Sequence, residues 1–184
     1  MLTELQKAKF TKHFQIRDTD NDGYVTQADY HKLTENIASI LGWDADHGKK
    51  AQIDGIHHGV WEFFWKPADH DGDGRVSLEE HLAMMGMMMS RSKDPDVLAQ
   101  SRKHSEVLFT TFDFNGDGLI SAEEYGQFFK AAGTEAEWSD DVFKRLDMNS
   151  NGSIALDEFV LLHQQFFSSD EPDAPGNWFY GPLA

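Results

Sequence analysis

Four segments of twelve residues place oxygen-bearing side chains at the spacing that a bound calcium ion requires. They are Asp18–Asp29, Asp69–Glu80, Asp113–Glu124 and Asp147–Glu158. Each has Asp at its first position, Asp or Asn at the third and fifth, Gly at the sixth, a β-branched residue at the eighth and an acid at the twelfth. Calcium takes about six to eight oxygen ligands at roughly 2.3–2.6 Å. The recurrence of this pattern predicts four cation-binding loops, and the alternative is four acidic, solvated turns.

Each position of the pattern has a chemical role, and together these roles define the EF-hand calcium loop. Positions one, three, five and twelve supply side-chain oxygens, whereas position seven supplies its backbone carbonyl. The glycine permits a turn that a Cβ atom disfavours, and the β-branched residue suits a short β-bridge between paired loops. The predicted metal ligands are Asp18, Asp20, Asp22, Tyr24 and Asp29; Asp69, Asp71, Asp73, Arg75 and Glu80; Asp113, Asn115, Asp117, Leu119 and Glu124; and Asp147, Asn149, Asn151, Ser153 and Glu158.

The loops differ in the ligands that they offer. The second and third loops end in Glu, which is long enough to reach an ion through both oxygens. The fourth loop has only two charged ligands and carries Ala155 at its ninth position, so we expect it to bind more weakly. The first loop ends in the shorter Asp29, which favours the six-coordination that magnesium prefers. We therefore expect three to four calcium ions, with magnesium competing at the first loop.

The charge of the chain is concentrated in these loops. The chain has 32 acidic and 16 basic residues, and half of the acids but only one base, Arg75, lie in the loops. Since the remainder is nearly neutral and shows no basic patch, we expect no nucleic-acid partner. The chain has no Cys, which excludes disulfides and Cys-based zinc sites. It also shows no nucleophile–base arrangement and no phosphate loop, so we expect no enzyme activity.

The apolar residues indicate a protein with a substantial core that does not enter membranes. Hydrophobic residues make up 40% of the 184 residues, and 14 of them are Phe. No apolar run approaches the roughly 20 residues of a membrane-spanning helix. The first residues, MLTELQKAKFTKHF, form a charged amphipathic segment that differs from a secretory signal. We expect a cytoplasmic monomer.

Flanking helices must position the loops, which predicts an all-α fold of four EF-hands in two pairs packed into one compact globule. The first pair should span residues 1–92, the second residues 93–167, and an apolar tail, residues 168–184, should pack on the body through Trp178–Tyr180. Thr134 and Glu137 have the spacing of a capping box that opens a helix. The expected helices are 3–17, 27–41, 49–66, 78–92, 95–112, 122–132, 135–146 and 156–167.

With these features the chain resembles the invertebrate sarcoplasmic calcium-binding proteins. The resemblance covers essentially the whole chain and depends on the four loops, the wide spacing of the first pair and the ending FYGPLA after an acidic linker. The same superfamily includes the calcium-triggered photoproteins and the coelenterazine-binding protein. The resemblance implies two EF-hand pairs packed face to face around an enclosed apolar interior, and a role as a calcium and magnesium buffer. Members of the group have typically lost one loop, whereas all four loops here keep their side-chain ligands.

Two alternatives to a buffer remain open. A calcium sensor would use the methionines of one helix, Met84, Met85 and Met87–Met89, to bind a partner helix. These methionines are equally explained as filler of an irregular core, and sensors favour evenly spaced loops in two lobes, which this chain lacks.

The second alternative is a coelenterazine-binding or photoprotein-like protein, which would bind a hydrophobic small molecule. His163 and Tyr180 match the photoproteins' functional histidine and C-terminal tyrosine in position. Polar and aromatic groups on the third helix could line the same pocket. A buried hydrogen bond between His163 and Tyr180 explains the pair without a ligand. The residues in question on the third helix are His57, His58, Trp61 and Trp65.

Overall fold

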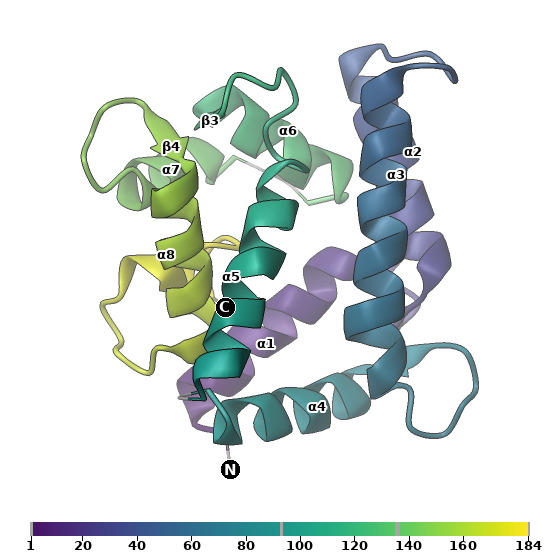
Figure 1. Cartoon of the computed structure of the whole chain (residues 1–184), viewed down its shortest axis with the longest axis vertical. Helices are drawn as coiled ribbons and strands as arrows, with labels where there is room; N and C mark the ends of the chain where they lie inside the picture. The colour runs from purple at the N-terminus through teal and green to yellow at the C-terminus, as the bar shows by residue number, and fades with distance from the viewer. Residues whose placement is uncertain (1, 93, 135–136, 184) are drawn as a thin grey trace.

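The computed structural model describes residues 2–92, 94–134 and 137–183, and the fold is all-α with two very small sheets (Figure 1). The third helix continues through a π-helical turn, Trp61–Trp65, into a 3₁₀ turn, Lys66–Ala68, and another 3₁₀ turn, Pro175–Trp178, lies in the tail. Among these residues, no helix is both long and apolar enough to cross a membrane. The helices are α1 (Glu4–Arg17), α2 (Gln27–Leu41), α3 (Gly48–Val60), α4 (Leu78–Ser90), α5 (Pro95–Phe109), α6 (Ala122–Ala131), α7 (Ser139–Leu146) and α8 (Leu156–Ser168).

The helices that leave the first three loops begin with a capping box built from loop residues. Ser77 is the N-cap of α4, and the side chain of Glu80 accepts a hydrogen bond from the backbone N–H of Ser77. Thr26 with Asp29 on α2, and Ser121 with Glu124 on α6, repeat the arrangement. The ninth and twelfth residues of these loops are therefore also the N-cap and third residue of a helix. Local helix energetics thus fixes the last predicted ligand of each of these loops.

Most expected helix boundaries lie within two residues of the structure, and three differ by more. The expected helix over residues 95–112 ends at Phe109. The seventh helix begins at Ser139 and not at residue 135, and residues 135–136 lie outside the described chain. Thr134 does not open this helix, because its hydroxyl donates a hydrogen bond to the carbonyl of Phe129 at 2.7 Å near the end of α6. The expected helix over residues 49–66 is α-helical only to Val60, since the backbone then widens into the π turn.

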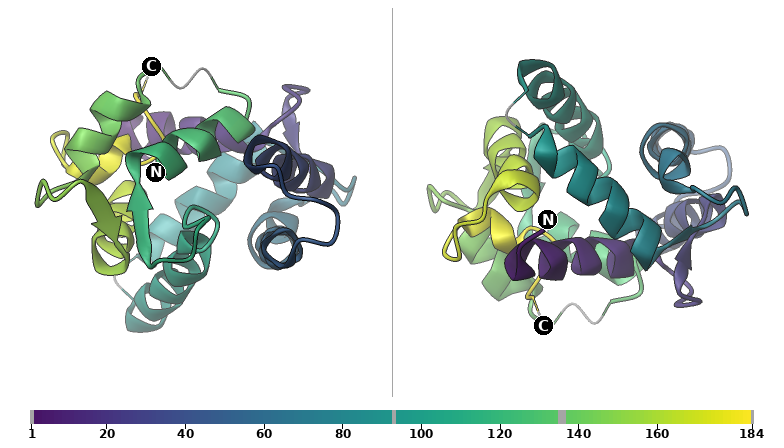
Figure 2. Two further views of the ribbon diagram at one scale, coloured as in Figure 1. Left: turned by 90° about the horizontal axis from the view of Figure 1, so that it is seen from above. Right: turned by 90° about the horizontal axis from the view of Figure 1, so that it is seen from below.

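One large core joins both halves of the chain and the tail. Phe112 and Phe128 stack with ring centroids 3.9 Å apart, and Phe112 also meets Phe159 of α8 edge to face. Phe179 and Tyr180 of the tail are 2% and 0% exposed and belong to the same cluster. Figure 2 shows the tail lying beside α1 and α8. The tail therefore lies where the helices of the two halves meet.

Candidate metal centres

Short antiparallel strands join the loops in pairs. Strand β1 (Tyr24–Val25) pairs with β2 (Val76–Ser77), and β3 (Leu119–Ser121) pairs with β4 (Ser153–Ala155). The β-branched residues at the eighth positions lie opposite each other, Val25 with Val76 and Ile120 with Ile154. This confirms the bridge that their side chains predicted. Each bridge fixes the two loops of a pair side by side.

The first Asp of every loop folds back over the loop and accepts hydrogen bonds from backbone amides. Asp18, for example, accepts from the N–H groups of Asp22 and Gly23 at 3.1 and 3.0 Å. The glycine at the sixth position has a positive φ in every loop, between 84° and 90°, where a Cβ atom would be strained. The equivalent bonds from the sixth-position N–H groups of Gly74, Gly118 and Gly152 reach Asp69, Asp113 and Asp147 at 3.0, 3.1 and 2.7 Å.

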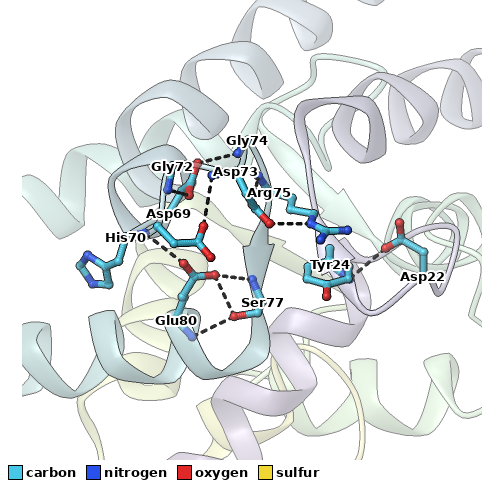
Figure 3. Close-up of polar contacts among 11 residues, drawn as sticks. Asp22, Tyr24, Asp69, His70, Gly72, Asp73, Gly74, Arg75, Ser77 and Glu80 are labelled. Carbon is cyan, nitrogen blue, oxygen red and sulfur yellow. Dashed lines mark hydrogen bonds and ion pairs between the residues drawn. The ribbon is translucent and has the colours of Figure 1, made fainter.

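The twelfth residue closes the loop from the opposite side. In the second loop, Glu80 Oε1 accepts a hydrogen bond from the N–H of His70 at 3.0 Å, and Oε2 accepts from the N–H and hydroxyl of Ser77 at 2.9 and 2.8 Å (Figure 3). The hydrogen bonds from Ser77 are the main reason why the pKa of Glu80 is held below its usual value. Glu124 makes the equivalent contacts in the third loop. Both carboxylates lie across their loops.

The shorter Asp29 reaches the same position in the first loop. Its Oδ1 accepts from the N–H and hydroxyl of Thr19, both at 3.0 Å, and its Oδ2 accepts from the N–H and hydroxyl of Thr26, both at 2.8 Å. Only 4% of Asp29 is exposed. Four hydrogen bonds therefore hold the Asp29 carboxylate in place. Because Asp is shorter than Glu, this carboxylate is less able to bind an ion through both of its oxygens.

The fourth loop is built differently at two places. Ala155 has no hydroxyl for Glu158, and Glu158 Oε2 instead accepts a hydrogen bond from the side-chain amide of Asn149 at 3.1 Å. Two predicted ligands of this loop are thus hydrogen-bonded to each other. In addition, Ser150 has a φ of 57°, a left-handed conformation that the second and third loops assign to glycine and the first loop to Asn21, and asparagine tolerates it better than serine. Both features support the expectation that the fourth loop binds more weakly.

The donor set fits a hard divalent cation. Side-chain oxygens of Asp18, Asp20 and Asp22 lie within 4.8 Å of one another, and those of Asp69, Asp71 and Asp73 do the same. Like charges this close repel unless a cation lies among them. In the first loop, partial burial raises the pKa of Asp18. Oxygen-only donors of this kind suit calcium and magnesium better than softer metals.

The side chain at the seventh position of the second loop has a role that sequence reasoning missed. The loop pattern predicts only that the backbone carbonyl of Arg75 binds the ion. In the structure, Arg75 Nε also donates a hydrogen bond to Asp73 Oδ2 at 2.7 Å. The guanidinium also lies 3.8 Å from the ring centroid of Tyr24, the seventh residue of the first loop (Figure 3). The signal in the sequence was that Arg75 is the one basic residue among the four loops.

An apolar cleft of about 690 Å³ lies between α3, α4, α5 and α8. Its walls include Phe64, Met85, Met89, His104, His163 and Phe167. Phe63, which lies in the π turn after α3 and also lines the cleft, is 88% exposed. The resemblance implied an enclosed interior, and the structure differs because α3 packs on α2 whereas α5 packs on α8. The methionines of α4 divide accordingly, with Met85 buried and Met87 62% exposed.

The structure corrects the expected pocket residues. His163 lies at the cleft, but Tyr180 lies in the core and contacts Arg17, so no His163–Tyr180 hydrogen bond forms. Instead, His163 Nδ1 lies 2.8 Å from the hydroxyl of Ser105. The four candidates on the third helix are not among the cleft's lining residues, because they pack on or beside α2 and the first-pair core. They are His57, His58, Trp61 and Trp65.

Comparisons with known proteins agree with this geometry. Models of the EF-hand domain pair match residues 1–37 and 102–163, and an EF-hand model matches residues 68–84. The sarcoplasmic calcium-binding protein of Perinereis vancaurica tetradentata is 29% identical over 98% of this chain and 99% of its own length. The luciferin-binding protein of Renilla reniformis is 28% identical over 90% of this chain and 88% of its own length. The calcium-loaded apo form of the coelenterazine-binding protein from Renilla muelleri has a TM-score of 0.76 at 25% identity, covering 99% of this chain and 100% of that chain.

Proposed function

We propose that this chain, an EF-hand calcium-binding protein of the sarcoplasmic calcium-binding family, is a cytosolic calcium buffer that takes up three to four ions as a monomer. The observation that carries the proposal is common to all four loops: the twelfth-position carboxylate lies across the loop and meets a backbone amide at its second or third position. The oxygens at positions one, three, five, seven and twelve would then surround the ion. These are the twenty residues that the sequence predicts as ligands.

The packing of the tail favours a buffer over a sensor. A sensor opens its helix pairs when calcium binds and exposes a groove for a partner helix. Here the tail is wedged between helices of both halves, since Tyr125 donates its hydroxyl proton to the carbonyl of Phe179 at 3.1 Å and Arg17 donates to the Tyr180 hydroxyl at 3.4 Å. Opening either pair would break this packing, so calcium should order the protein without opening it.

The proposal is tested by calcium titration with and without millimolar magnesium, comparing the wild-type protein with an Asp29→Glu variant. Isothermal calorimetry of the wild type should find three to four calcium ions, with magnesium weakening the uptake of one of them. In Asp29→Glu the longer side chain supplies a second oxygen to calcium, so this magnesium effect should fall several-fold. Glu124→Gln serves as a control, because it should remove a different site and leave the magnesium effect intact. Saturation at two or fewer ions would contradict the proposal.

A second candidate function, binding of a hydrophobic small molecule, is favoured by the cleft. Its volume lies within the range of about 300–1,000 Å³ typical of ligand pockets, and its walls are mainly apolar with a few polar groups. Flexible methionines can adapt such a wall to a ligand. Two of the similar proteins carry luciferin or coelenterazine in their names. We propose a ligand of that hydrophobic, aromatic kind for the cleft.

The hydrogen bonding of His163 specifies which polar group such a ligand would carry. Burial lowers the pKa of His163 well below its usual value, so the ring is neutral. Ser105 donates its hydroxyl proton to the carbonyl of Ser101 at 2.9 Å and therefore accepts a proton from His163 Nδ1. This leaves Nε2 as an acceptor, and Nε2 has no partner among the described residues. A ligand that moves the neighbouring side chains aside would donate a hydrogen bond to Nε2 from a hydroxyl or an N–H group.

Filling the cleft should abolish binding of coelenterazine. Gly59 lines the cleft on α3, and a Cβ atom built there meets nothing within 4 Å, so Gly59→Leu fills space without a clash. We expect micromolar binding to the wild type, followed by tryptophan quenching, and at least a tenfold loss in Gly59→Leu. Gly48→Leu, at the start of the same helix and equally free of contacts, should bind as the wild type does. Equal affinities of the two variants would refute a ligand in this cleft.

A further inference from the structure

We propose that the Arg75 side chain is a built-in counter-ion of the first loop pair. It pairs with a predicted ligand of the second loop before metal binds, and it thereby lowers the calcium affinity of that loop. The inference rests on the proposed function, because it concerns the same loops. It identifies a residue that sets affinity through its side chain, although its position in the loop is expected to supply only a carbonyl oxygen.

The ion pair with Asp73 places this cation directly on a predicted calcium ligand. Arg75 Nε lies 2.7 Å from Asp73 Oδ2, while Asp73 Oδ1 accepts the backbone N–H of Arg75 at 3.1 Å. Both oxygens of the fifth-position carboxylate are thus engaged by one residue. Calcium that binds through Asp73 must displace the guanidinium or share the carboxylate with it. Either outcome brings a positive charge close to the incoming ion.

The stack on Tyr24 keeps the guanidinium in this place. Its carbon atom lies 3.8 Å from the centroid of the Tyr24 ring, close enough for a cation–π contact. Tyr24 pairs with Ser77 across the strands, so the seventh-position side chains of the two loops meet diagonally on one face of the bridge. The planar guanidinium can stack and pair with a carboxylate at once, which a lysine ammonium cannot do. Asp73 and, from the first loop, Asp22 hold the pKa of Arg75 above its usual value.

The second pair of loops lacks this device. The seventh residue of the third loop is Leu119, which is 41% exposed and carries no charge, and that of the fourth loop is Ser153. The two pairs therefore differ by one positive charge at equivalent positions. The second loop has the largest number of acids among the four, and Arg75 offsets one of them. The ranking of the loops by ligand charge alone accordingly overstates the affinity of the second loop.

The size of the effect follows from Coulomb's law. A single and a double positive charge about 6 Å apart in water repel by an amount that changes a binding constant about tenfold. Because the Arg75 side chain is about half exposed, salt should screen most of this repulsion above physiological ionic strength. The inference thus predicts a calcium affinity that depends on salt in the first pair more than in the second.

The test replaces Arg75 by the residue that the third loop has at the same position. Arg75→Leu should raise the calcium affinity of the second loop about tenfold at low ionic strength, measured by calorimetry on the whole protein, and less than threefold in 0.5 M KCl. Arg75→Lys keeps the charge but loses the stack on Tyr24, so its calcium affinity should lie between those of the wild type and Arg75→Leu. Leu119→Arg, the reciprocal variant, should weaken calcium binding to the third loop. An unchanged affinity in Arg75→Leu at low salt, while the ions still bind, overturns the inference.

A second measurement on the metal-free protein separates this inference from the proposed function. The ring current of Tyr24 should shift the side-chain NMR signals of Arg75 upfield, and Tyr24→Leu should remove that shift. If the second loop of the wild type bound no calcium, the proposed function would fail there, whereas an upfield-shifted Arg75 would still support the placement of the counter-ion. Unshifted Arg75 signals in the chelated protein would overturn the inference whatever the loops bind.

Discussion

Chelation of calcium should lower the melting temperature of this protein by roughly 20–40 °C. An ion at a free concentration one hundred times its dissociation constant stabilises the folded state by about 2.7 kcal/mol, so four such ions contribute about 11 kcal/mol. This is comparable to the whole stability of a typical domain, about 5–15 kcal/mol. In a chain of this size each kcal/mol corresponds to about 2–4 °C. The physical origin is the acidic charge of the loops, whose carboxylates repel one another when no cation lies among them.

The measurement is thermal unfolding followed by circular dichroism, in calcium and in excess chelator, at low and high salt. Added potassium chloride should recover part of the stability of the chelated protein, because monovalent salt screens the repulsion without filling the sites. Glu124→Gln should lower the melting temperature in calcium but change it little in chelator. A melting curve that chelation does not alter would show that the loops contribute no binding energy to the fold.

The loops could be predicted from sequence because their chemistry is local. All the predicted side-chain ligands of one loop lie within twelve residues, and the glycine at the sixth position serves a turn whose strain is also local. Helix starts were equally accessible where loop residues form the cap, as at Thr26 and Ser77. The start of α7 could not be predicted because Thr134 had two possible roles. It could cap the helix with Glu137, but its hydroxyl instead donates a hydrogen bond to the carbonyl of Phe129.

Features that depend on the packing of distant segments could not be predicted from the sequence pattern. The contact between Arg75 and Tyr24 requires the register of two strands that lie about fifty residues apart. The partner of His163 is Ser105 on α5, and no spacing rule distinguishes it from Tyr180. The cleft lies between α3, which packs on α2, and α5, which packs on α8. Such choices are decided by the sum of many contacts, which a single sequence does not reveal.

Truncation of one tail residue, Phe179→Ala, should lower the free energy of unfolding by about 3–5 kcal/mol even in saturating calcium. Phe179 is 2% exposed, and its ring packs edge to face on those of Phe159 and His163, with ring centroids 4.9 and 5.2 Å apart. Removing a buried Phe side chain loses its transfer energy and leaves a cavity that a closely packed core fills only in part. Phe63→Ala is the matched control, since Phe63 is 88% exposed and its loss should change stability by no more than about 0.5 kcal/mol.

The same substitution also tests whether the tail couples the two loop pairs. Tyr180, next to Phe179, contacts Arg17, which immediately precedes the first predicted ligand, while the carbonyl of Phe179 is held by Tyr125, which follows the last ligand of the third loop. Loosening the tail should therefore weaken calcium binding in both pairs, because part of the binding energy would then be used to restore the fold. Urea unfolding gives the stability, and calorimetry gives the affinities. A loss confined to the second pair would mean that the tail supports only the half of the chain to which it is joined.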